Sequence, residues 1–327
     1  MKKRSIITGG AGFIGSNLIN ALTNIGQEIF LCDYSKALFK KYFVNYNRII
    51  RIIEPYKIFD FLDKNKVNVV FHLGAISSTT FEDNSKYWID NVLFSTKLWS
   101  ICSKRNIRLI YASSASTYGN GTYGFEDKED INYLKKLRSL NVYGWTKSQI
   151  DLRNVYAKNI YNIAPPQWVG LKFFNVYGNN EYHKNNMISI VLKTYMQIKR
   201  GKQTNLFKSY KKNYKHGEQK RDFVYIKDCI NVLLWFLENK NLSGIFNIGT
   251  GQSNTFNELV SNVYQRLNKN INLKYIDMPD DIKKQYQYET KANLSKLRNI
   301  GYKKKFYSLK DGISDYIDIL ESDGSIS

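Results

Sequence analysis

The feature that most constrains this chain is a glycine-spaced loop near its start. Thr8-Gly-Gly-Ala-Gly-Phe-Ile-Gly15 follows an apolar segment, Ser5 to Thr8, that predicts a strand, and it leads into a helix predicted from Phe13 to Ile25. Such a loop needs glycine because its backbone turns tightly and approaches a ligand closely. A pyrophosphate held there would lie at the positive end of the helix dipole. The GxxGxxG spacing therefore predicts dinucleotide contacts at Gly9, Gly12 and Gly15.

The residue expected to choose between dinucleotides is Asp33, at the end of the next predicted strand, Glu28 to Asp33. An acidic side chain at this distance from the loop commonly accepts a hydrogen bond from the ribose 2′-hydroxyl, which favours NAD. Lys36 and Lys40 follow closely, and either could neutralise a 2′-phosphate instead. The residues alone therefore leave NAD and NADP open.

A second signal lies downstream, where Tyr143-Gly-Trp-Thr-Lys147 begins a helix predicted from Val142 to Tyr161. Residues four apart lie on one helix face, so the phenol and the ammonium are neighbours. The positive charge favours the phenolate and lets the tyrosine exchange a proton near neutral pH. A Tyr-x-x-x-Lys match arises easily by chance in a chain with 25 tyrosines. In one chain with the glycine loop, however, it indicates a nicotinamide-dependent enzyme of the short-chain dehydrogenase type.

Two more predicted strands end in small or polar residues. His72-Leu-Gly-Ala75 ends the first, where the diphosphate and ribose of the cofactor should pass, and Tyr111-Ala-Ser-Ser114 ends the second. A hydroxyl at the latter end can hydrogen-bond a substrate alcohol, and we prefer Ser114 to Ser113 as a catalytic residue. The competing interpretation is a strand end whose serines only satisfy the backbone.

Short apolar runs alternate with helical patterns through the first half of the chain, which predicts an α/β fold with a Rossmann-type, doubly wound parallel sheet. Ligands then bind beyond the carboxyl ends of the strands. The pattern becomes mixed after Asn175-Val-Tyr-Gly178. We predict a dinucleotide-binding domain over residues 1–175, to which later segments return, a smaller mixed α/β substrate lobe over 176–320, and a frayed tail over 321–327.

The composition narrows the class of partner. A formal charge of +21 favours anionic ligands, including dinucleotides and nucleotide sugars as well as nucleic acid. Only Lys208 to Arg221 is densely basic, and we interpret its middle as a solvated loop. No apolar run could span a bilayer, and Met1-Lys-Lys-Arg4 lacks the apolar stretch of a signal peptide, so we expect no membrane contact and a cytoplasmic protein. Three scattered cysteines without metal spacing predict reduced packing residues and no metal site.

Further motifs follow the glycine loop in a fixed order. They are Gly74-Ala-Ile-Ser-Ser-Thr-Thr80, Tyr111-Ala-Ser-Ser-Ala-Ser-Thr-Tyr-Gly119, Asn141-Val-Tyr-Gly144, Phe174-Asn-Val-Tyr-Gly178, His183-Lys184, Lys220-Arg-Asp-Phe-Val-Tyr225 and Gly244-Ile-Phe-Asn-Ile-Gly-Thr-Gly251. In this order they closely resemble the ADP-glyceromanno-heptose 6-epimerases, a family of extended short-chain dehydrogenases, from Ile6 to roughly Ile319. The Ser-Ser-Thr-Thr run, the His-Lys pair and Tyr286-Gln287 are the most specific parts.

The resemblance implies an isomerase with bound NADP that converts ADP-D-glycero-D-manno-heptose to its L-glycero epimer at C6″. It implies transient oxidation to a ketone, followed by reduction from the other face, with Tyr143 and Lys184 as the two acid/base residues. It also implies Lys147 and Ser114 as their catalytic partners, and a product used in lipopolysaccharide or another surface glycan. The apolar and aromatic content permits a homo-oligomer, which we expect.

Contacts carried over by position fall into two groups. The cofactor group adds to the glycines Phe13, Ile14, Asp33, Tyr34, Lys40, Leu73, Gly74, Ala75, Ile76, Ser77, Asn91, Lys147, Val176 and Lys184. The substrate group comprises Asn175, Asn186, Lys193, Phe207, Lys208, Ser209, Tyr210, Arg221 and Tyr286. Asn185-Asn186 replaces a usual Gly-Ser and Lys193 a usual histidine, and the Lys208 to Lys220 segment is longer than the family's.

Two alternatives stay open at this point. A sugar-nucleotide 4-epimerase or 4,6-dehydratase would share the glycine loop, Ser114, Tyr143 and Lys147, although a dehydratase needs an acidic residue beside that serine and Ser113 to Thr117 offers none. A basic nucleic-acid-binding protein with an inactive Rossmann core would show a steep salt dependence of binding.

Overall fold

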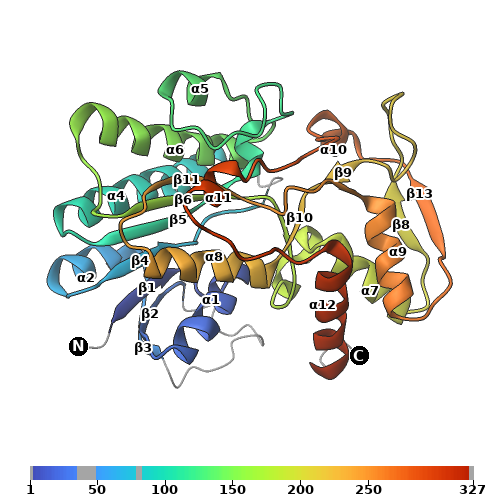
Figure 1. The fold of residues 1–327 in the computed structure, drawn as a ribbon, viewed down its shortest axis with the longest axis horizontal. Helices are drawn as coiled ribbons and strands as arrows, with labels where there is room; N and C mark the ends of the chain where they lie inside the picture. Colours follow the sequence, from blue (N-terminus) through green and yellow to red (C-terminus); the bar gives the residue numbers. More distant parts are fainter. Residues whose placement is uncertain (1–2, 35–48, 79–82, 324–327) are drawn as a thin grey trace.

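The fold is built around a parallel β-sheet (Figure 1), and the computed structural model describes residues 3–34, 49–78 and 83–323. Within these residues the sheet has seven strands in the order β11-β6-β5-β4-β1-β2-β3, and all neighbouring pairs are parallel. The strands are β1 (Arg4–Thr8), β2 (Glu28–Cys32), β3 (Ile49–Ile53), β4 (Val69–His72), β5 (Arg108–Ser114), β6 (Trp168–Phe173) and β11 (Gly244–Ile248). Every residue of β4, β6 and β11 is buried, as expected for a parallel sheet covered on both faces. The predicted Rossmann-type fold class is confirmed.

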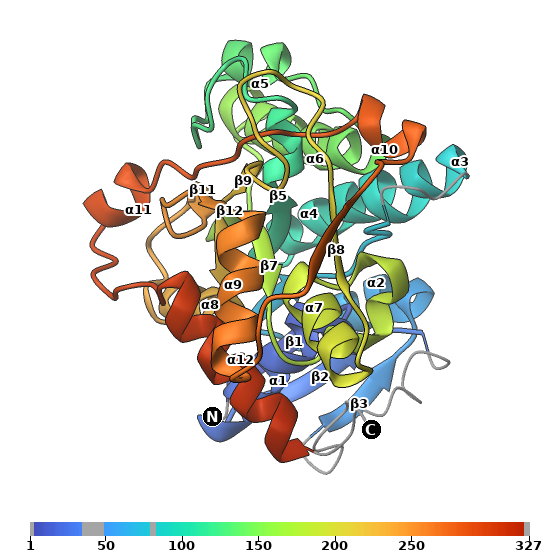
Figure 2. The same ribbon diagram turned by 90° about the vertical axis from the view of Figure 1, so that its right-hand side faces the viewer.

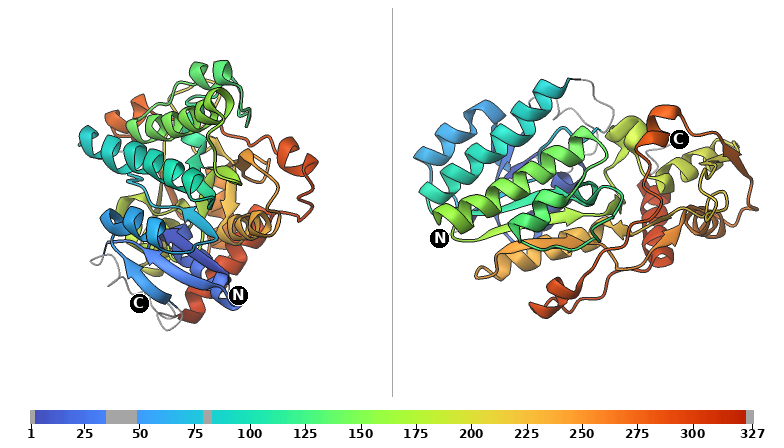
Figure 3. Two further views of the ribbon diagram at one scale, coloured as in Figure 1. Left: turned by 90° about the vertical axis from the view of Figure 1, so that its left-hand side faces the viewer. Right: turned by 90° about the horizontal axis from the view of Figure 1, so that it is seen from above.

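Helices cover both faces of this sheet (Figure 3). One apolar core contains side chains of α1 (Phe13–Asn24) and α8 (Ile226–Glu238). The other contains side chains of α2 (Ile58–Lys64), α4 (Phe94–Lys104) and α6 (Val142–Tyr161). Helix α4 continues a run of helical segments that begins with α3 (Asn84–Tyr87) and the π-helical η4 (Trp88–Leu93).

A smaller lobe lies at one end of the sheet and carries α7, α9, α12 and β8 (Figure 2). Within the described residues it includes three two-stranded sheets, which pair β7 (Asn175–Tyr177) with β10 (Phe223–Tyr225), β9 (Lys220–Arg221) with β12 (Asn254–Thr255), and β8 (Thr204–Phe207) with β13 (Leu273–Ile276). Its longer helices are α7 (Ile190–Lys199), α9 (Phe256–Arg266) and α12 (Leu309–Asp323). The short helices of the chain are η3 (Pro55–Lys57), η5 (Ala115–Tyr118), α5 (Ile131–Lys136), η6 (Tyr182–Met187), α10 (Asp280–Lys284) and α11 (Ser295–Asn299).

Two segments depart from a simple division of the chain in sequence order. Strand β11 belongs to the large sheet, where it pairs with β6. Helix α12 continues to Asp323, into the segment expected to be a frayed tail, because Glu321 is held at both oxygens. Tyr195 donates to its Oε1 at 2.6 Å and Lys199 to its Oε2 at 2.8 Å. Residues 324–327 lie outside the described residues.

Candidate active site

A cavity of about 1040 Å³ lies at the carboxyl ends of the sheet strands. Its walls on the sheet side include Gly9 after β1, Asp33 after β2, Gly74 after β4 and Ser114 at the end of β5. Side chains of the smaller lobe complete it. A cavity bounded by strand ends on one side and a second lobe on the other is where doubly wound folds bind their ligands.

The glycine loop forms one edge of this cavity, and two of its glycines cannot be replaced without moving backbone. Gly9 has φ +66°, and a Cβ there would lie 2.5 Å from the Cα of Gly74. A Cβ on Gly15 would lie 2.2 Å from the carbonyl oxygen of Gly9. Helix α1 then begins at its N-cap, Gly12, with no side-chain cap and no acidic residue in its first turn. This N-terminus opens on the cavity and suits a phosphate, so the loop fits a dinucleotide.

Asp33 lies where the sequence predicts, and it also braces the loop. Its Oδ2 accepts from the backbone N–H of Ala11 at 2.9 Å, and its Oδ1 accepts from that of Tyr34 at 2.9 Å. Asp33 and Tyr34 both line the cavity. Lys36 and Lys40, the residues that bear on NAD against NADP, lie outside the described residues.

The loop after β4 forms the next part of the wall, with Leu73, Gly74, Ala75, Ile76 and Ser77. Asn91 lies behind this loop and is almost fully buried. Its Oδ1 accepts from the N–H of Ile76 at 2.8 Å, and its Nδ2 donates to the carbonyl of Ile76 at 3.1 Å. In this geometry Asn91 fixes the loop from the rear, and a direct cofactor contact by this side chain stays a prediction.

His72 ties the two loops together, a role that its position in the sequence does not reveal. The hydroxyl of Thr8 accepts from the N–H of Gly74 at 3.1 Å and lies 2.7 Å from Nδ1 of His72. Nε2 lies 2.7 Å from the hydroxyl of Ser95, which itself donates to the carbonyl of Asn91. Burial, and to a smaller extent the charge of Lys147, lowers the pKa of His72 to about 3. The ring is therefore neutral, with its proton on Nε2.

Tyr143 and Lys147 lie on the first turns of α6, which Asn141 caps by accepting from the N–H of Gly144 at 2.8 Å. Both line the cavity together with Ser114. The Lys147 Nζ donates to the carbonyl of Ala112 at 2.7 Å and lies 6.0 Å from the centroid of the Tyr143 ring. The structure thus brings together the three residues predicted from separate motifs.

Burial controls the acidity of this pair. It raises the pKa of Tyr143 to about 12, against a hydrogen bond from Ser114 that lowers it. It lowers the pKa of Lys147 to about 8, against the opposing charge of Asp151. The shift at Tyr143 is opposite to the one expected from the sequence, because loss of solvation outweighs the hydrogen bond from Ser114. A phenol in this position needs added positive charge beside it before it gives up its proton near neutral pH.

Lys184 reaches the same cavity from a different element, η6. Its Nζ lies 4.9 Å from the ring centroid of Phe13, at the start of α1. The loop leading to it is tied to α1 twice, since Asn17 Nδ2 donates to the carbonyl of Asn179 at 2.9 Å and Asn180 Nδ2 donates to the hydroxyl of Ser16 at 3.1 Å. Burial lowers the pKa of Lys184, and Glu181 opposes that shift. A partly buried lysine of lowered pKa is suited to proton transfer.

The opposite wall carries most of the predicted substrate contacts. The cavity lining includes Asn175, Val176, Lys193, Phe207, Arg221 and Tyr286. Arg221 is buried, with its guanidinium 5.0 Å from the Tyr286 ring centroid and 5.7 Å from that of Phe256. Such a fork beside aromatic faces suits a diphosphate.

Three of the predicted substrate residues, Lys208, Ser209 and Tyr210, are not part of the cavity lining. Lys208 Nζ pairs with Asp277 at 3.2 Å, and Tyr210 OH donates to the same carboxylate at 2.8 Å. Ser209 donates to the carbonyl of Lys211 at 3.2 Å. Their substrate contacts stay predictions, as does that of Asn186, whose side chain lies outside the described structure.

Gln219 lines the cavity and was not among the sequence-predicted residues. Its side chain is 1% exposed, and its Nε2 donates to the carbonyls of Phe207 and Lys208 at 3.3 and 3.2 Å. Its Oε1 has no hydrogen-bond partner among the described residues. A buried acceptor of this kind usually finds a partner, and a ligand in the cavity can supply it. An isolated glutamine in a basic segment gives no signal from which this could be foreseen.

Among the described residues, no group of three or more His, Cys, Asp or Glu side chains is placed to hold a metal ion. No helix in the described part of the chain combines the length and apolarity that crossing a bilayer requires.

The sheet order, the glycine loop against α1, and the serine, tyrosine and lysine at one cavity together define the class of extended short-chain dehydrogenases. Comparison with known proteins narrows this class. The chain belongs to the NAD dependent epimerase/dehydratase family, whose model matches residues 5–249.

Individual relatives are similar over nearly the whole chain. The ADP-L-glycero-D-manno-heptose-6-epimerase of Fusobacterium nucleatum is 41% identical, covering 95% of this chain and 96% of its own. The enzyme of the same name from Brachyspira hyodysenteriae is 38% identical, with 98% of each chain covered. Among solved structures, the Helicobacter pylori ADP-L-glycero-D-manno-heptose-6-epimerase has a TM-score of 0.76 at 27% identity, with 98% of this chain and 97% of that chain covered. The Thermus thermophilus UDP-glucose 4-epimerase in complex with NAD shares the fold, with a TM-score of 0.77 at 22% identity over 97% and 99% of the two chains.

Proposed function

We propose that this protein is an ADP-glyceromanno-heptose 6-epimerase. It inverts C6″ of ADP-D-glycero-D-manno-heptose by transient oxidation to a ketone and re-reduction, with no net redox change. The observation that carries the proposal is the similarity to heptose epimerases at 38–41% identity over about 95% of the chain or more, joined to a cavity that holds Tyr143 and Lys184 on separate elements. Epimerisation by this route needs a proton-transfer group for each orientation of the sugar.

In this proposal the chain's residues divide the work. A bound nicotinamide supplies the hydride acceptor and donor for C6″. Tyr143 and Lys184 remove or return the hydroxyl proton, one for each orientation. The Lys147 ammonium stabilises the Tyr143 phenolate, and the Ser114 hydroxyl orients the substrate alcohol. Arg221 pairs with the substrate diphosphate, between Tyr286 and Phe256.

We propose NADP as the cofactor. Family membership gives a nicotinamide dinucleotide, and Lys36 and Lys40 follow Asp33 closely enough in sequence to face a 2′-phosphate. A dinucleotide that is regenerated in place gains nothing from fast release, so purified protein should carry it. Mass spectrometry of the acid-released nucleotide that found only NAD would overturn this choice and the role of the two lysines.

The deciding experiment is NMR of purified enzyme with ADP-D-glycero-D-manno-heptose and no added cofactor. We expect inversion at C6″ alone, and turnover lowered by about a hundredfold or more in a Tyr143→Phe variant that still carries nucleotide. Inversion at C4″ or loss of water would replace the proposal by a 4-epimerase or a 4,6-dehydratase. Steeply salt-dependent binding of a polynucleotide, without turnover, would favour the nucleic-acid alternative. Three buried free thiols, Cys32, Cys102 and Cys229, suit the cytoplasmic location that the proposal assumes.

A further inference from the structure

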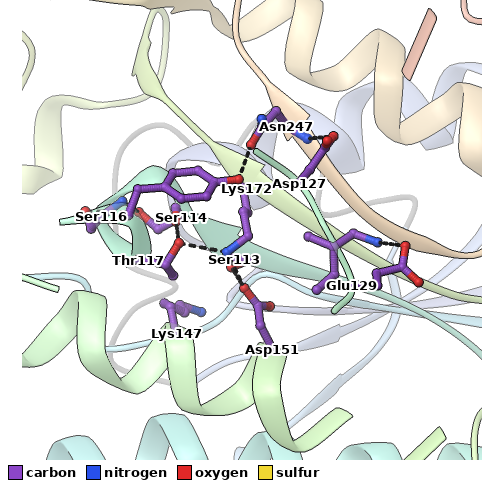
Figure 4. A network of polar contacts seen from close by, with 12 residues as sticks. Ser113, Ser114, Ser116, Thr117, Asp127, Glu129, Lys147, Asp151, Lys172 and Asn247 are labelled. Carbon is purple, nitrogen blue, oxygen red and sulfur yellow. Dashed lines mark hydrogen bonds and ion pairs between the residues drawn. The ribbon is translucent and has the colours of Figure 1, made fainter. Parts of the chain in front are cut away.

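A buried pair of opposite charges, Asp151 and Lys172, lies near Lys147 (Figure 4). Asp151 follows Lys147 by one turn of α6, and Lys172 stands on β6. The Lys172 Nζ lies 2.7 Å from Asp151 Oδ2, and both side chains are 0% exposed. Neither residue lines the cavity, so a contact with cofactor or substrate does not account for them.

The hydrogen bonds of this pair lead to β5 and to the corner after it, which present Ser114. Ser113, the neighbouring residue, donates to Asp151 Oδ2 at 2.6 Å, and Tyr111 on the same strand donates to Oδ1 at 3.1 Å. Lys172 donates to the hydroxyl of Thr117 at 2.7 Å, and that hydroxyl donates to the carbonyl of Ser114 at 2.9 Å. The pair therefore holds the Ser113 to Thr117 corner against α6 and β6.

Stability alone is a poor reason for such a pair. Desolvating two charges costs several kcal/mol for each ion, and apolar residues of similar volume often do as well or better. The site does have a use for a fixed charge, because the Lys147 ammonium is buried and its one hydrogen bond within the described residues goes to the uncharged carbonyl of Ala112. The Lys147 pKa responds to the Asp151 carboxylate, which raises it against the effect of burial.

We propose that Asp151 and Lys172 are a positioning pair for catalysis. They hold the Ser114 corner in register with Tyr143 and place a fixed negative charge one helical turn behind Lys147. The inference rests on the proposed function of that site, and it adds two residues that touch neither substrate nor cofactor.

Other titratable groups packed around Lys147 do not compete for this role. They are His72 on β4, Tyr87 on α3, Tyr111 on β5 and Tyr118 on η5. The pKa of His72 is lowered to about 3, and burial raises the pKa of Tyr111 and of Tyr118 well above the usual value. His72, Tyr111 and Tyr118 therefore keep one protonation state between pH 5 and 9. Asp90 lies on the cavity wall at η4, and Asp127 and Glu129 lie farther out, bonded to Asn247 and Lys296.

Removing either partner of the pair should shift the pKa values of Lys147 and Tyr143, and the two variants should shift them in opposite directions. Asp151→Asn leaves Lys172 uncompensated, and the added positive potential lowers the pKa of both Lys147 and Tyr143. Lys172→Met leaves Asp151 uncompensated and raises both. The two limbs of the pH profile of kcat should therefore move together, towards acid in the first variant and towards alkali in the second, by about one pH unit. A packing role alone would lower activity or stability in both variants without opposite shifts.

The experiment combines that profile with an NMR titration of Lys147 in the nucleotide-loaded enzyme, labelled with ¹³C at lysine Cε and assigned against Lys147→Arg. Lys172→Arg keeps the positive charge that Lys172→Met removes, so both limbs of its pH profile should lie at their wild-type positions. Lys296→Met is the matched control, since Lys296 pairs with Glu129 away from the cavity, and it should alter only the melting temperature. Limbs that do not move, or that move in the same direction in both single variants, overturn the proposal.

One further variant, together with the NMR titration, gives a clear outcome even if a single variant does not fold or the enzyme does not turn over ADP-heptose. If a single variant does not fold, Thr117→Val removes the link to Ser114 without changing charge, and kcat should fall roughly tenfold or more with unchanged nucleotide content. Wild-type kcat in that variant refutes the positioning role. The NMR titration needs no turnover, so a wild type inactive on ADP-heptose would reject the proposed function, whereas an unmoved Lys147 titration would reject the pair.

Discussion

The neutral His72 predicts a specific loss of stability in acid. An unfolded histidine titrates near pH 6.5, while the pKa of the buried ring is lowered to about 3. A base whose pKa is lowered on folding contributes stability above its unfolded pKa, and that contribution is lost as the pH falls towards the folded value. At pH 5 the unfolded state has gained a proton that the folded state has not. Over these 1.5 units the loss is about 2 kcal/mol.

The assay is urea unfolding of wild type and His72→Gln at pH 7 and pH 5. The variant should be less stable at pH 7, because it loses the bonds to Thr8 and Ser95. Its deficit should shrink by about 2 kcal/mol at pH 5, where only the wild type still carries the proton linkage. The free energies of unfolding of wild type and variant must be subtracted at each pH, because Asp228 is present in both and its effect on stability has the opposite pH dependence. Its pKa is raised to about 6 by burial, so its contribution grows as the pH falls from 6 towards 4.

His216→Gln is the matched control for replacing a histidine, because His216 is exposed and lies outside the hydrogen bonds that join Thr8, His72 and Ser95. A deficit of His72→Gln that stays the same at both pH values would refute the linkage, and would mean that the ring is charged in the folded protein. A deficit that grows in acid would refute it equally.

Three further outcomes follow from the cavity. Tyr143→Phe and Lys184→Met should each lower turnover by about a hundred- to ten-thousand-fold in the NMR assay with nucleotide still bound, and a Lys184→Met enzyme near the wild-type rate would leave a single-base mechanism on Tyr143. Gly15→Ala places a Cβ 2.2 Å from the Gly9 carbonyl oxygen, so the purified protein should carry little nucleotide and melt at a lower temperature, and full nucleotide content would contradict the steric argument. Gln219→Leu removes a buried acceptor from the cavity and should raise KM roughly tenfold with little change in kcat, whereas an unchanged KM would mean that the substrate does not use it.

Local signals in the sequence were enough to predict the sheet and one side of the site. Strands β1 and β2 fall within a residue of the ranges predicted for them, and β4 and β5 end at His72 and Ser114, within the motifs that were expected to end them. The glycine loop and the Tyr143 helix depend on neighbours in sequence, and both lie where the motifs indicate. Strand β3 was not predicted. Its sequence, Ile-Ile-Arg-Ile-Ile, has a charged residue at its centre and therefore does not resemble the apolar runs of the other strands.

Features that depend on distant pairing could not be predicted. Strand β8 pairs with β13 across a long stretch of chain, and neither has an apolar run of its own that marks a sheet. Nothing in the sequence distinguishes Lys172 from the other lysines of the chain, because only the packing of β6 against α6 brings it to Asp151. Lys208 and Tyr210 matched substrate positions, yet Asp277, far along the chain, holds both away from the cavity lining.

The attachment of the Lys184 loop to α1 bears on what moves during turnover. Asn17 and Asn180 fasten this loop to the helix that begins at the glycine loop, and Lys184 rests on the Phe13 ring. Both bonds fasten the Lys184 loop to the part of the fold that also carries Tyr143. In the proposed mechanism the sugar, rather than this loop, turns over between the two half-reactions, pivoting about a nucleotide held at Arg221. The motion that separates the two half-reactions is then a rotation of the keto-sugar within the cavity.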